Sequence, residues 1–238
     1  MISRQTNYLK GAITKMKRLF ASVISCVLIL SLICSGLTVF ATTITGAVDT
    51  DNFVRGVDVS TLDMLEDLGA RFYQNNVESD ALTILKNNGA NYVRLKLWVD
   101  PYDENGNPYG GGNNDYATTL ALARRAKNLG MGVLIDFHLS DFWTDPANQI
   151  KPKAWKDLSY SELKTTLYNY MKDTLNNFAA AGIVPEMVQV GNEISTGILH
   201  DDGKVGNGNE DFSNLAGLLE SAIAGVRASS ASNTKIIL

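Results

Sequence analysis

The chain has 238 residues, of which 45% are hydrophobic and 19% charged, and its formal net charge is −4. This composition permits a globular fold. Beyond its first 41 residues the chain is acidic and has no cluster of Lys and Arg, so it is a poor candidate for binding nucleic acid. The two histidines, His138 and His200, are too few for a histidine-rich metal site.

The N-terminal segment differs in kind from the rest of the chain. Lys15, Lys17 and Arg18 precede a mostly apolar run over residues 19–40, which ends in Val39, Phe40 and then Ala41. A basic segment, an apolar segment and small residues before a cleavage point predict a secretory signal peptide at 1–41, and hence a secreted, extracellular protein. Because the apolar run is long enough to span a bilayer, a retained membrane anchor is the alternative.

Cleavage of this leader changes the chemistry of the chain that remains. Both cysteines, Cys26 and Cys34, lie in the leader, so the mature chain has no thiol and a cysteine-based site is excluded. The leader also holds five basic residues and no acidic ones, which leaves a mature net charge of −9. Neither a nucleic acid nor, after cleavage, a membrane is an expected partner.

Strand-like runs alternate with helical patterns through the rest of the chain. The helical patterns cover 80–88, 116–129, 159–181 and 212–229, and the third opens with a capping box formed by Ser159 and Glu162. Strands that alternate with helices predict a parallel sheet covered by helices. The strand-like runs lie at 54–60, 92–99, 133–139, 187–193 and 235–238.

Each strand-like run has one apolar face and one polar face. A central strand of an open α/β sheet is apolar on both faces, whereas an inner wall that becomes polar toward the strand ends predicts a (β/α) barrel. An antiparallel sheet with one wet face is the alternative, which the intervening helices disfavour. Since buried charges must be paired, the acids are expected to bind Arg94 and Lys96. The polar positions are Asp58, Arg94, Lys96, Asp136, His138, Gln189 and Glu193.

The chain is short for a complete barrel. An eightfold (β/α) barrel needs about 250 residues, whereas 197 remain once residues 1–41 are removed from 238. They hold four strand-helix pairs and a fifth strand, and the chain ends within that strand. We therefore expect residues 42–238 to be the truncated N-terminal part of a catalytic (β/α)8 domain, whose barrel is incomplete here.

The run 187–193 ends in two polar residues, Asn192 and Glu193, at the predicted mouth of the barrel. We expect the small and apolar neighbours of Glu193 to shield it from water, which suits an acid that holds its proton near neutral pH. Retaining glycosidases pair such an acid with a second carboxylate about 5–5.5 Å away. Asn192 is a candidate ligand for a sugar hydroxyl. The alternative is a structural Glu193 paired with Arg94 or Lys96.

Five segments then follow one another in an order that resembles one enzyme family. They are GVDVS at 56–60, VRLKLWVDPY at 93–102, DFHLSDFWTDP at 136–146, PKAW at 152–155 and VGNEI at 190–194. From about Phe53 to its end, the chain resembles glycoside hydrolase family 53, the endo-β-1,4-galactanases. The Asn-Glu pair alone is common among retaining barrel glycosidases, whereas the segment at 136–146 followed by PKAW is specific.

The resemblance implies endo-hydrolysis of β-1,4-galactan in pectic arabinogalactan by a retaining (β/α)8 barrel. This chemistry needs no cofactor, and residues 42–238 offer no candidate metal ligands. The resemblance also implies that Glu193 is the general acid/base and that the nucleophile is a Glu on strand seven, beyond the end of this chain. This chain alone is therefore expected to be inactive. The residues that the resemblance places around the substrate are Asn192, Arg94, Asp58, His138, Asp141 and Trp143.

Several alternatives remain open on the sequence. His138 is equally compatible with a hydrogen-bonded residue of the inner wall. Packing within the loop is the alternative for Trp143 and the expectation for Trp155. At the level of function, the alternatives are another retaining barrel glycosidase of the mannanase or xylanase type and a noncatalytic carbohydrate-binding barrel. The sequence carries no signal for an oligomeric state.

Overall fold

The computed structural model describes residues 53–206, 208 and 210–238. The signal peptide predicted at 1–41 lies outside these residues. Residues Val54–Leu238 form one compact unit. Within the described ranges, no helix combines the length and the apolar character needed to cross a bilayer.

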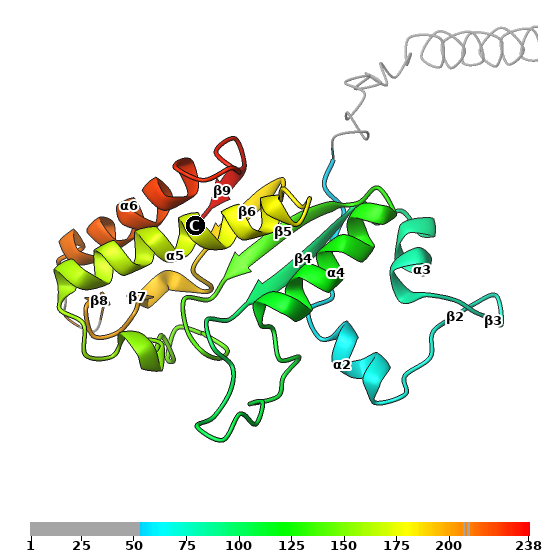
Figure 1. Cartoon of the computed structure of the whole chain (residues 1–238), viewed down its shortest axis with the longest axis horizontal. Helices are drawn as coiled ribbons and strands as arrows, with labels where there is room; N and C mark the ends of the chain where they lie inside the picture. The colour runs from blue at the N-terminus through cyan, green and yellow to red at the C-terminus, as the bar shows by residue number, and fades with distance from the viewer. Residues whose placement is uncertain (1–52, 207, 209) are drawn as a thin grey trace, which may run out of the picture. The chain divides into compact units, whose positions relative to one another are not determined.

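Five parallel strands form the central sheet (Figure 1). They pair in chain order, β1-β4-β5-β6-β9, with every pair parallel. A doubly wound sheet reverses its strand order at a switch point, whereas sequential order is that of a barrel wall. The prediction of a (β/α) barrel that is incomplete here is confirmed. The strands are β1 (Gly56–Asp58), β4 (Tyr92–Leu97), β5 (Gly132–Phe137), β6 (Met187–Val190) and β9 (Lys235–Ile237).

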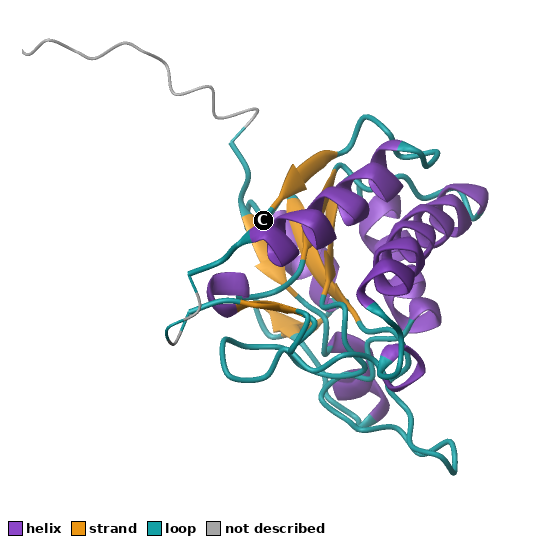
Figure 2. Cartoon of the chain, turned by 90° about the vertical axis from the view of Figure 1, so that its left-hand side faces the viewer, coloured by secondary structure: helices purple, strands orange, loops and turns teal. Residues whose placement is uncertain are grey.

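Helices connect the successive strands. All four predicted helices are present, and their observed bounds are α3 (Ala81–Asn87), α4 (Tyr116–Asn128), α5 (Tyr160–Ala180) and α6 (Ser213–Arg227). The three long helices α4, α5 and α6 lie in front of the strands in Figure 1, and Figure 2 shows them together on one side of the sheet. The predicted capping box begins α5: the Ser159 hydroxyl accepts from the Glu162 N–H, and the Glu162 carboxylate accepts from the Ser159 N–H at 2.9 Å.

Short elements were not visible in the sequence. Each is shorter than the window over which hydrophobic periodicity can be recognised. They lie in the connections between the barrel strands, so they do not alter the order of the sheet. They are α2 (Leu62–Asp67), the hairpin of β2 (Tyr73–Gln74) and β3 (Val77–Glu78), the hairpin of β7 (Gly197–Ile198) and β8 (Gly203–Lys204), and the 3₁₀ turns η1 (Lys153–Trp155) and η2 (Ile194–Thr196).

The apolar core lies between the sheet and the helices. Leu95, Ile135 and Val188 are register neighbours on three strands, and all three are fully buried. Burial of such a side chain contributes about 1.5–3 kcal/mol. Trp155 is also buried and meets Tyr170 edge-to-face at a centroid distance of 5.3 Å, which confirms the expected packing role. The core therefore takes up the helix-facing side of the strands and leaves the other side to polar groups.

Polar side chains line that other side. Lys96 on β4 is the register neighbour of Asp136 on β5, which is in turn the neighbour of Gln189 on β6. Two residues before Lys96 on β4, Arg94 is the register neighbour of Asp58 on β1. The predicted inner wall with polar groups toward the strand ends is thus confirmed.

Candidate active site

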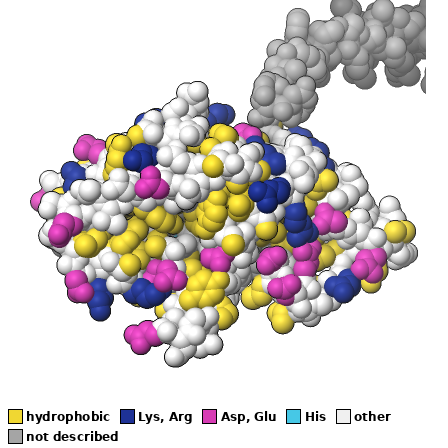
Figure 3. Space-filling model, viewed as in Figure 1, with side chains coloured by type: hydrophobic (Ala, Val, Ile, Leu, Met, Phe, Trp, Pro, Cys, Tyr) yellow, Lys and Arg dark blue, Asp and Glu magenta, His cyan; other side chains and the backbone are white. Residues whose placement is uncertain are grey.

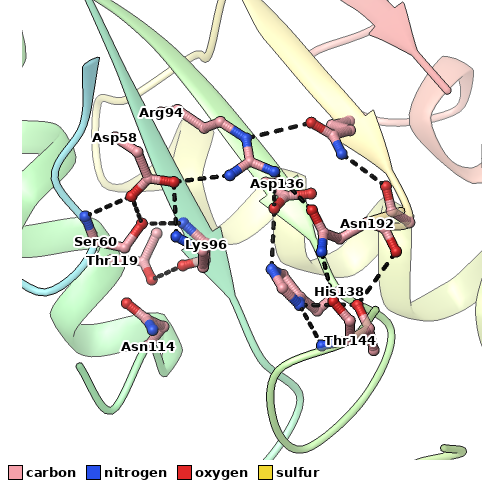
Figure 4. A network of polar contacts seen from close by, with 12 residues as sticks. Asp58, Ser60, Arg94, Lys96, Asn114, Thr119, Asp136, His138, Thr144 and Asn192 are labelled. Carbon is pink, nitrogen blue, oxygen red and sulfur yellow. Dashed lines mark hydrogen bonds and ion pairs between the residues drawn. The ribbon is translucent and has the colours of Figure 1, made fainter. Parts of the chain in front are cut away.

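The guanidinium of Arg94 connects four elements of the wall (Figure 4). Its Nη1 donates to Asp58 at 2.7 Å, its Nη2 donates to Asp136 at 2.6 Å and to Asn192 at 2.8 Å, and its Nε donates to Gln189 at 3.3 Å. A planar guanidinium presents its donors in a fixed fork, so several acceptors at once define its position. Arg94 therefore holds β1, β5 and β6 in one arrangement at the carboxyl end of the sheet.

Asp58 accepts hydrogen bonds from three side chains. Besides Arg94, these are Lys96 Nζ at 2.7 Å and the Ser60 hydroxyl at 2.7 Å. Burial alone raises the pKa of Asp58, but the hydrogen bonds from Lys96 and Ser60 outweigh it and hold this pKa below its ordinary value. The expected pairing of the wall acids with Arg94 and Lys96 is confirmed for Asp58 by both cations.

His138 lies just after β5 and is buried against Asp136. The backbone N–H of Thr144 donates to His138 Nδ1 at 3.0 Å, and because an N–H can only donate, Nδ1 must be the ring's acceptor. The ring proton then sits on Nε2, which lies 3.0 Å from Asp136 Oδ2 without the alignment of a full hydrogen bond. Asp136 is itself fully buried; the Arg94 guanidinium compensates its charge, and the neutral His138 ring lies against the same carboxylate oxygen.

The side-chain amide of Asn192 is fixed at both ends. Its oxygen accepts from Arg94, and its nitrogen donates to the Thr144 carbonyl at 2.6 Å. Its backbone carbonyl accepts from Gln149 Nε2 at 2.8 Å. Asn192 is 5% exposed, so the position of the residue that precedes Glu193 is determined by β4 and by the loop after β5.

Glu193 stands beyond the wall, at its rim. The strand β6 ends at Val190, and Glu193 adopts a left-handed conformation with φ 53° and ψ 49°. Its side chain is exposed, so the expectation that its neighbours shield it from water is wrong. The physical reason is that the strand stops three residues earlier than the sequence pattern predicted, which leaves Glu193 outside the packed wall.

The alternative of a structural Glu193 also finds no support in its contacts. Neither Arg94 nor Lys96 pairs with it; both bind Asp58. In the part of the chain that the structure describes, the Glu193 carboxylate has no hydrogen-bond or ion-pair partner. A structural carboxylate would be paired with a cation of the wall, whereas the Glu193 carboxylate remains available to bind a ligand.

Two further predicted residues come from the loop after β5. Trp143 meets His138 edge-to-face at 6.3 Å, and the Lys96 ammonium lies 4.6 Å from the Trp143 ring centroid. Asp141 has no contact with this network; its oxygens accept from the backbone N–H groups of Asp100 at 3.0 Å and Lys153 at 2.8 Å. The structure thus brings Trp143 to the polar wall and makes Asp141 a brace between two loops.

The sequence did not single out every residue of this network. Asp136, Lys96 and Gln189 were expected on the polar face but not named as site residues. Thr144 and Gln149, which fix His138 and Asn192, were not anticipated at all, since an irregular loop has no periodic signal that marks them. Among the described residues, no group of three His, Cys, Asp or Glu side chains is placed to hold a metal ion.

Comparisons with known proteins agree with this architecture. The family model of glycosyl hydrolase family 53 matches residues 54–238. The endo-β-1,4-galactanase of Bacillus subtilis is 49% identical over 147 residues, which are 61% of this chain and 34% of that protein. The arabinogalactan endo-β-1,4-galactanase A of Aspergillus niger is 40% identical over 185 residues, which are 77% of this chain and 49% of that protein.

A solved structure is similar as well. The family 53 catalytic domain of Ignisphaera aggregans superposes with a TM-score of 0.73 at 48% identity, covering 77% of this chain and 50% of that one. The chain thus spans about half the length, or less, of the proteins it matches. The family model covers most of the chain, and the sequential parallel strands agree with it. The chain belongs to glycosyl hydrolase family 53.

Proposed function

We propose that this chain is the N-terminal part of a secreted, retaining endo-glycosidase that hydrolyses β-1,4-galactan in arabinogalactan. The relatives from Bacillus subtilis and Aspergillus niger are named for that activity. One observation carries the proposal: the Glu193 carboxylate is exposed and has no partner among the described residues, and it directly follows Asn192, whose amide is fixed by Arg94 and Thr144. A free carboxyl on a fixed support is what proton transfer to a substrate requires.

Glu193 takes the role of general acid and then general base. It protonates the glycosidic oxygen as the bond breaks, and later removes a proton from the water that releases the sugar. Its left-handed backbone supports this role, because non-glycine residues held in sparsely populated conformations cluster at active sites.

The surrounding residues bind and orient the substrate. Asn192 Nδ2 carries two hydrogens, and donation to Thr144 uses one of them, so the other can donate to a sugar hydroxyl. Trp143 is 43% exposed, with Lys96 against its ring, and offers an aromatic surface to a pyranose. Asp58 and His138 hold the arrangement through Arg94 and Asp136.

The retaining mechanism needs a second carboxylate as nucleophile. The two acids of the described wall, Asp58 and Asp136, are held in ion pairs with Arg94 and do not fill this role. Family membership supports a nucleophilic Glu on strand seven, beyond residue 238. We therefore propose that this chain alone is inactive and that the complete protein needs no cofactor.

The test compares the complete protein with its Glu193→Gln variant. We expect hydrolysis of β-1,4-galactan, but not of mannan or xylan, with retained anomeric configuration by NMR. Glu193→Gln should lose activity on galactan. It should still form the glycosyl-enzyme from an aryl β-galactoside whose leaving group needs no proton. Because the general base is missing as well, it should turn this substrate over only when azide is added, with a β-galactosyl azide as the product. The control is Glu220→Gln, an exposed glutamate on α6, which should be fully active.

The same assays separate the alternatives. Turnover of mannan or xylan would identify a different barrel glycosidase. Binding of galactan without turnover by the unsubstituted protein would identify a noncatalytic binding barrel. N-terminal sequencing of protein from the culture medium tests secretion, and a start at Thr42 would support cleavage after Ala41.

A further inference from the structure

We propose that Tyr109 and Phe142 form a second saccharide-binding position, outside the reaction centre, which takes one hexopyranosyl unit of a neutral β-linked chain. The inference rests on the proposed function, since it assigns part of the binding surface of the same cleft. We refer to Tyr109 and Phe142 together as the aromatic platform.

Both side chains of the platform are exposed to solvent. Tyr109 is 45% exposed and Phe142 is 41% exposed, although Phe is among the residue types most often fully buried. They come from the loops that follow β4 and β5, and their rings meet edge-to-face at a centroid distance of 6.1 Å. Figure 3 shows hydrophobic side chains gathered in the lower middle of the face that it draws.

The platform is supported from beneath. Phe142 lies against Trp98, at a centroid distance of 4.9 Å, and Trp98 is only 1% exposed. Gly111, with φ +67°, allows the loop to approach: a Cβ there would stand 3.3 Å from the Trp98 ring and 3.6 Å from Phe142. The exposed rings are therefore seated on a buried aromatic residue and are not loose loop tips.

The two loops are also joined to each other. Asp141 accepts from the backbone of Asp100 in one loop and of Lys153 in the other, and the Lys153 ammonium lies 5.8 Å from the Tyr109 ring centroid. Side chains that are ordered before a ligand arrives lose less conformational entropy when it binds. The structural role of Asp141 is therefore to hold the two loops that carry the platform in a fixed position.

The platform and the candidate active site share a buried aromatic support. Trp98 meets His138 edge-to-face at 6.2 Å, and His138 meets Trp143 in the same way at 6.3 Å. Because Trp98 and His138 are buried, these contacts run beneath the surface and give the platform and the wall that holds Arg94 and Asn192 one common support. A linear polysaccharide bound at the wall would meet the platform with a neighbouring sugar unit.

The chemistry of the platform selects a neutral sugar. A pyranose ring has hydroxyl groups at its edge and C–H bonds on its faces, and the slightly positive C–H hydrogens are attracted to the negative face of an aromatic ring. In β-galactopyranose the hydrogens on C3, C4 and C5 share one face. The nearby cation, Lys153, is already paired with Asp100 and Asp141, so an anionic ligand gains no partner there.

The experiment is calorimetric titration of the complete protein carrying Glu193→Gln, which prevents turnover. The ligands are β-1,4-linked galacto-, gluco- and manno-oligosaccharides of increasing length. Tyr109→Ala removes one ring, Phe142→Leu removes the other but keeps an apolar contact with Trp98, and Tyr73→Ala, at an exposed tyrosine of β2, is the matched control. Near-UV circular dichroism confirms that each variant is folded.

We expect each platform variant to weaken binding of the longer oligosaccharides about three- to tenfold, the scale of one aromatic contact. The shortest ligand that binds should be unaffected, and Tyr73→Ala should match the parent at every length. An unchanged affinity for long ligands, or an equal loss at all lengths, would overturn the platform while leaving galactan hydrolysis intact. Conversely, the same length-dependent loss with gluco- or manno-oligosaccharides alone would support the platform and overturn galactan as the substrate.

Discussion

Arg94 Nη2 lies 2.6 Å from Asp136 Oδ2 and 2.8 Å from Asn192 Oδ1. One nitrogen therefore joins the buried acid of β5 to the residue that precedes Glu193. Since Asp136 is fully buried, it needs a cation for compensation, and the cation it binds is also the one that orients Asn192. Stability and the geometry of the proposed acid/base are thus coupled through a single side chain.

Replacement of Arg94 by Met should leave Asp136 buried with its charge uncompensated. We expect the free energy of unfolding to fall by about 3 kcal/mol, as measured by urea denaturation. Adding Asp136→Asn should restore part of the loss, with a coupling energy of about 1–3 kcal/mol between the two positions. Lys156→Met, which removes an exposed ion pair with Asp157, is the control and should change stability by less than about 0.5 kcal/mol. Additive effects at positions 94 and 136 would contradict the pairing.

The neutral ring of His138 should carry its proton on Nε2. The Thr144 N–H occupies Nδ1, so ¹⁵N-edited NMR at pH 7.5 should show a pyrrole-type Nε2 and a pyridine-type Nδ1. His138→Gln removes these signals and assigns them, and Thr144→Ala should leave the tautomer unchanged because it keeps the backbone donor. A ring protonated on Nδ1 would show that this hydrogen bond does not form.

The contribution of Asp58 to stability should depend on pH. Its pKa lies below the ordinary 3.8 because hydrogen bonds from Lys96 and Ser60 outweigh its burial. The folded state therefore favours the charged form, and the stabilisation is present above the unfolded pKa and lost as pH falls through the lower folded value. Asp58→Asn should lower the free energy of unfolding by about 1–2 kcal/mol at pH 7. The difference in stability between the variant and the parent protein should shrink below about pH 4. Asp173→Asn, at an exposed position, is the control, and a penalty for Asp58→Asn that stays constant from pH 7 to pH 3 would refute this origin.

Helices α5 and α6 pack closely at Gly225. A Cβ at that position would overlap the backbone carbonyl of Tyr168 and stand 3.0 Å from Met171 Cβ, and a backbone carbonyl in a helix cannot move aside. Gly225→Ala should therefore destabilise the protein by about 1–3 kcal/mol, despite the higher helix propensity of Ala. Gly217→Ala, also in α6, is the matched control, because its Cβ would meet the hydroxyl end of Tyr160 and the ammonium of Lys164, which are the far ends of flexible side chains and can move aside. Equal melting temperatures for the two variants would contradict the close approach.

The sequence by itself determined the elements and their faces. Helix α5 was recognisable from its capping box and apolar spacing, and the alternation in β4 placed Arg94 and Lys96 on the polar side. These signals are local: a cap involves residues three apart, and a strand pattern involves residues two apart. Such patterns are visible in one sequence because they depend only on the geometry of the backbone.

Only the tertiary structure decided which polar groups meet. The contact between Arg94 and Asn192 joins residues 98 positions apart, and the loop after β5 brings Thr144 to both His138 and Asn192. The exposure of Glu193 follows from its left-handed backbone conformation, which the hydrophobic periodicity of the sequence does not predict. Asp141 braces two loops for the same reason, because the path of an irregular loop is set by its contacts in three dimensions. The sequence therefore determined where the carboxyl ends of the strands lie, and the folded chain decided which side chains are bound there and which remain free for a ligand.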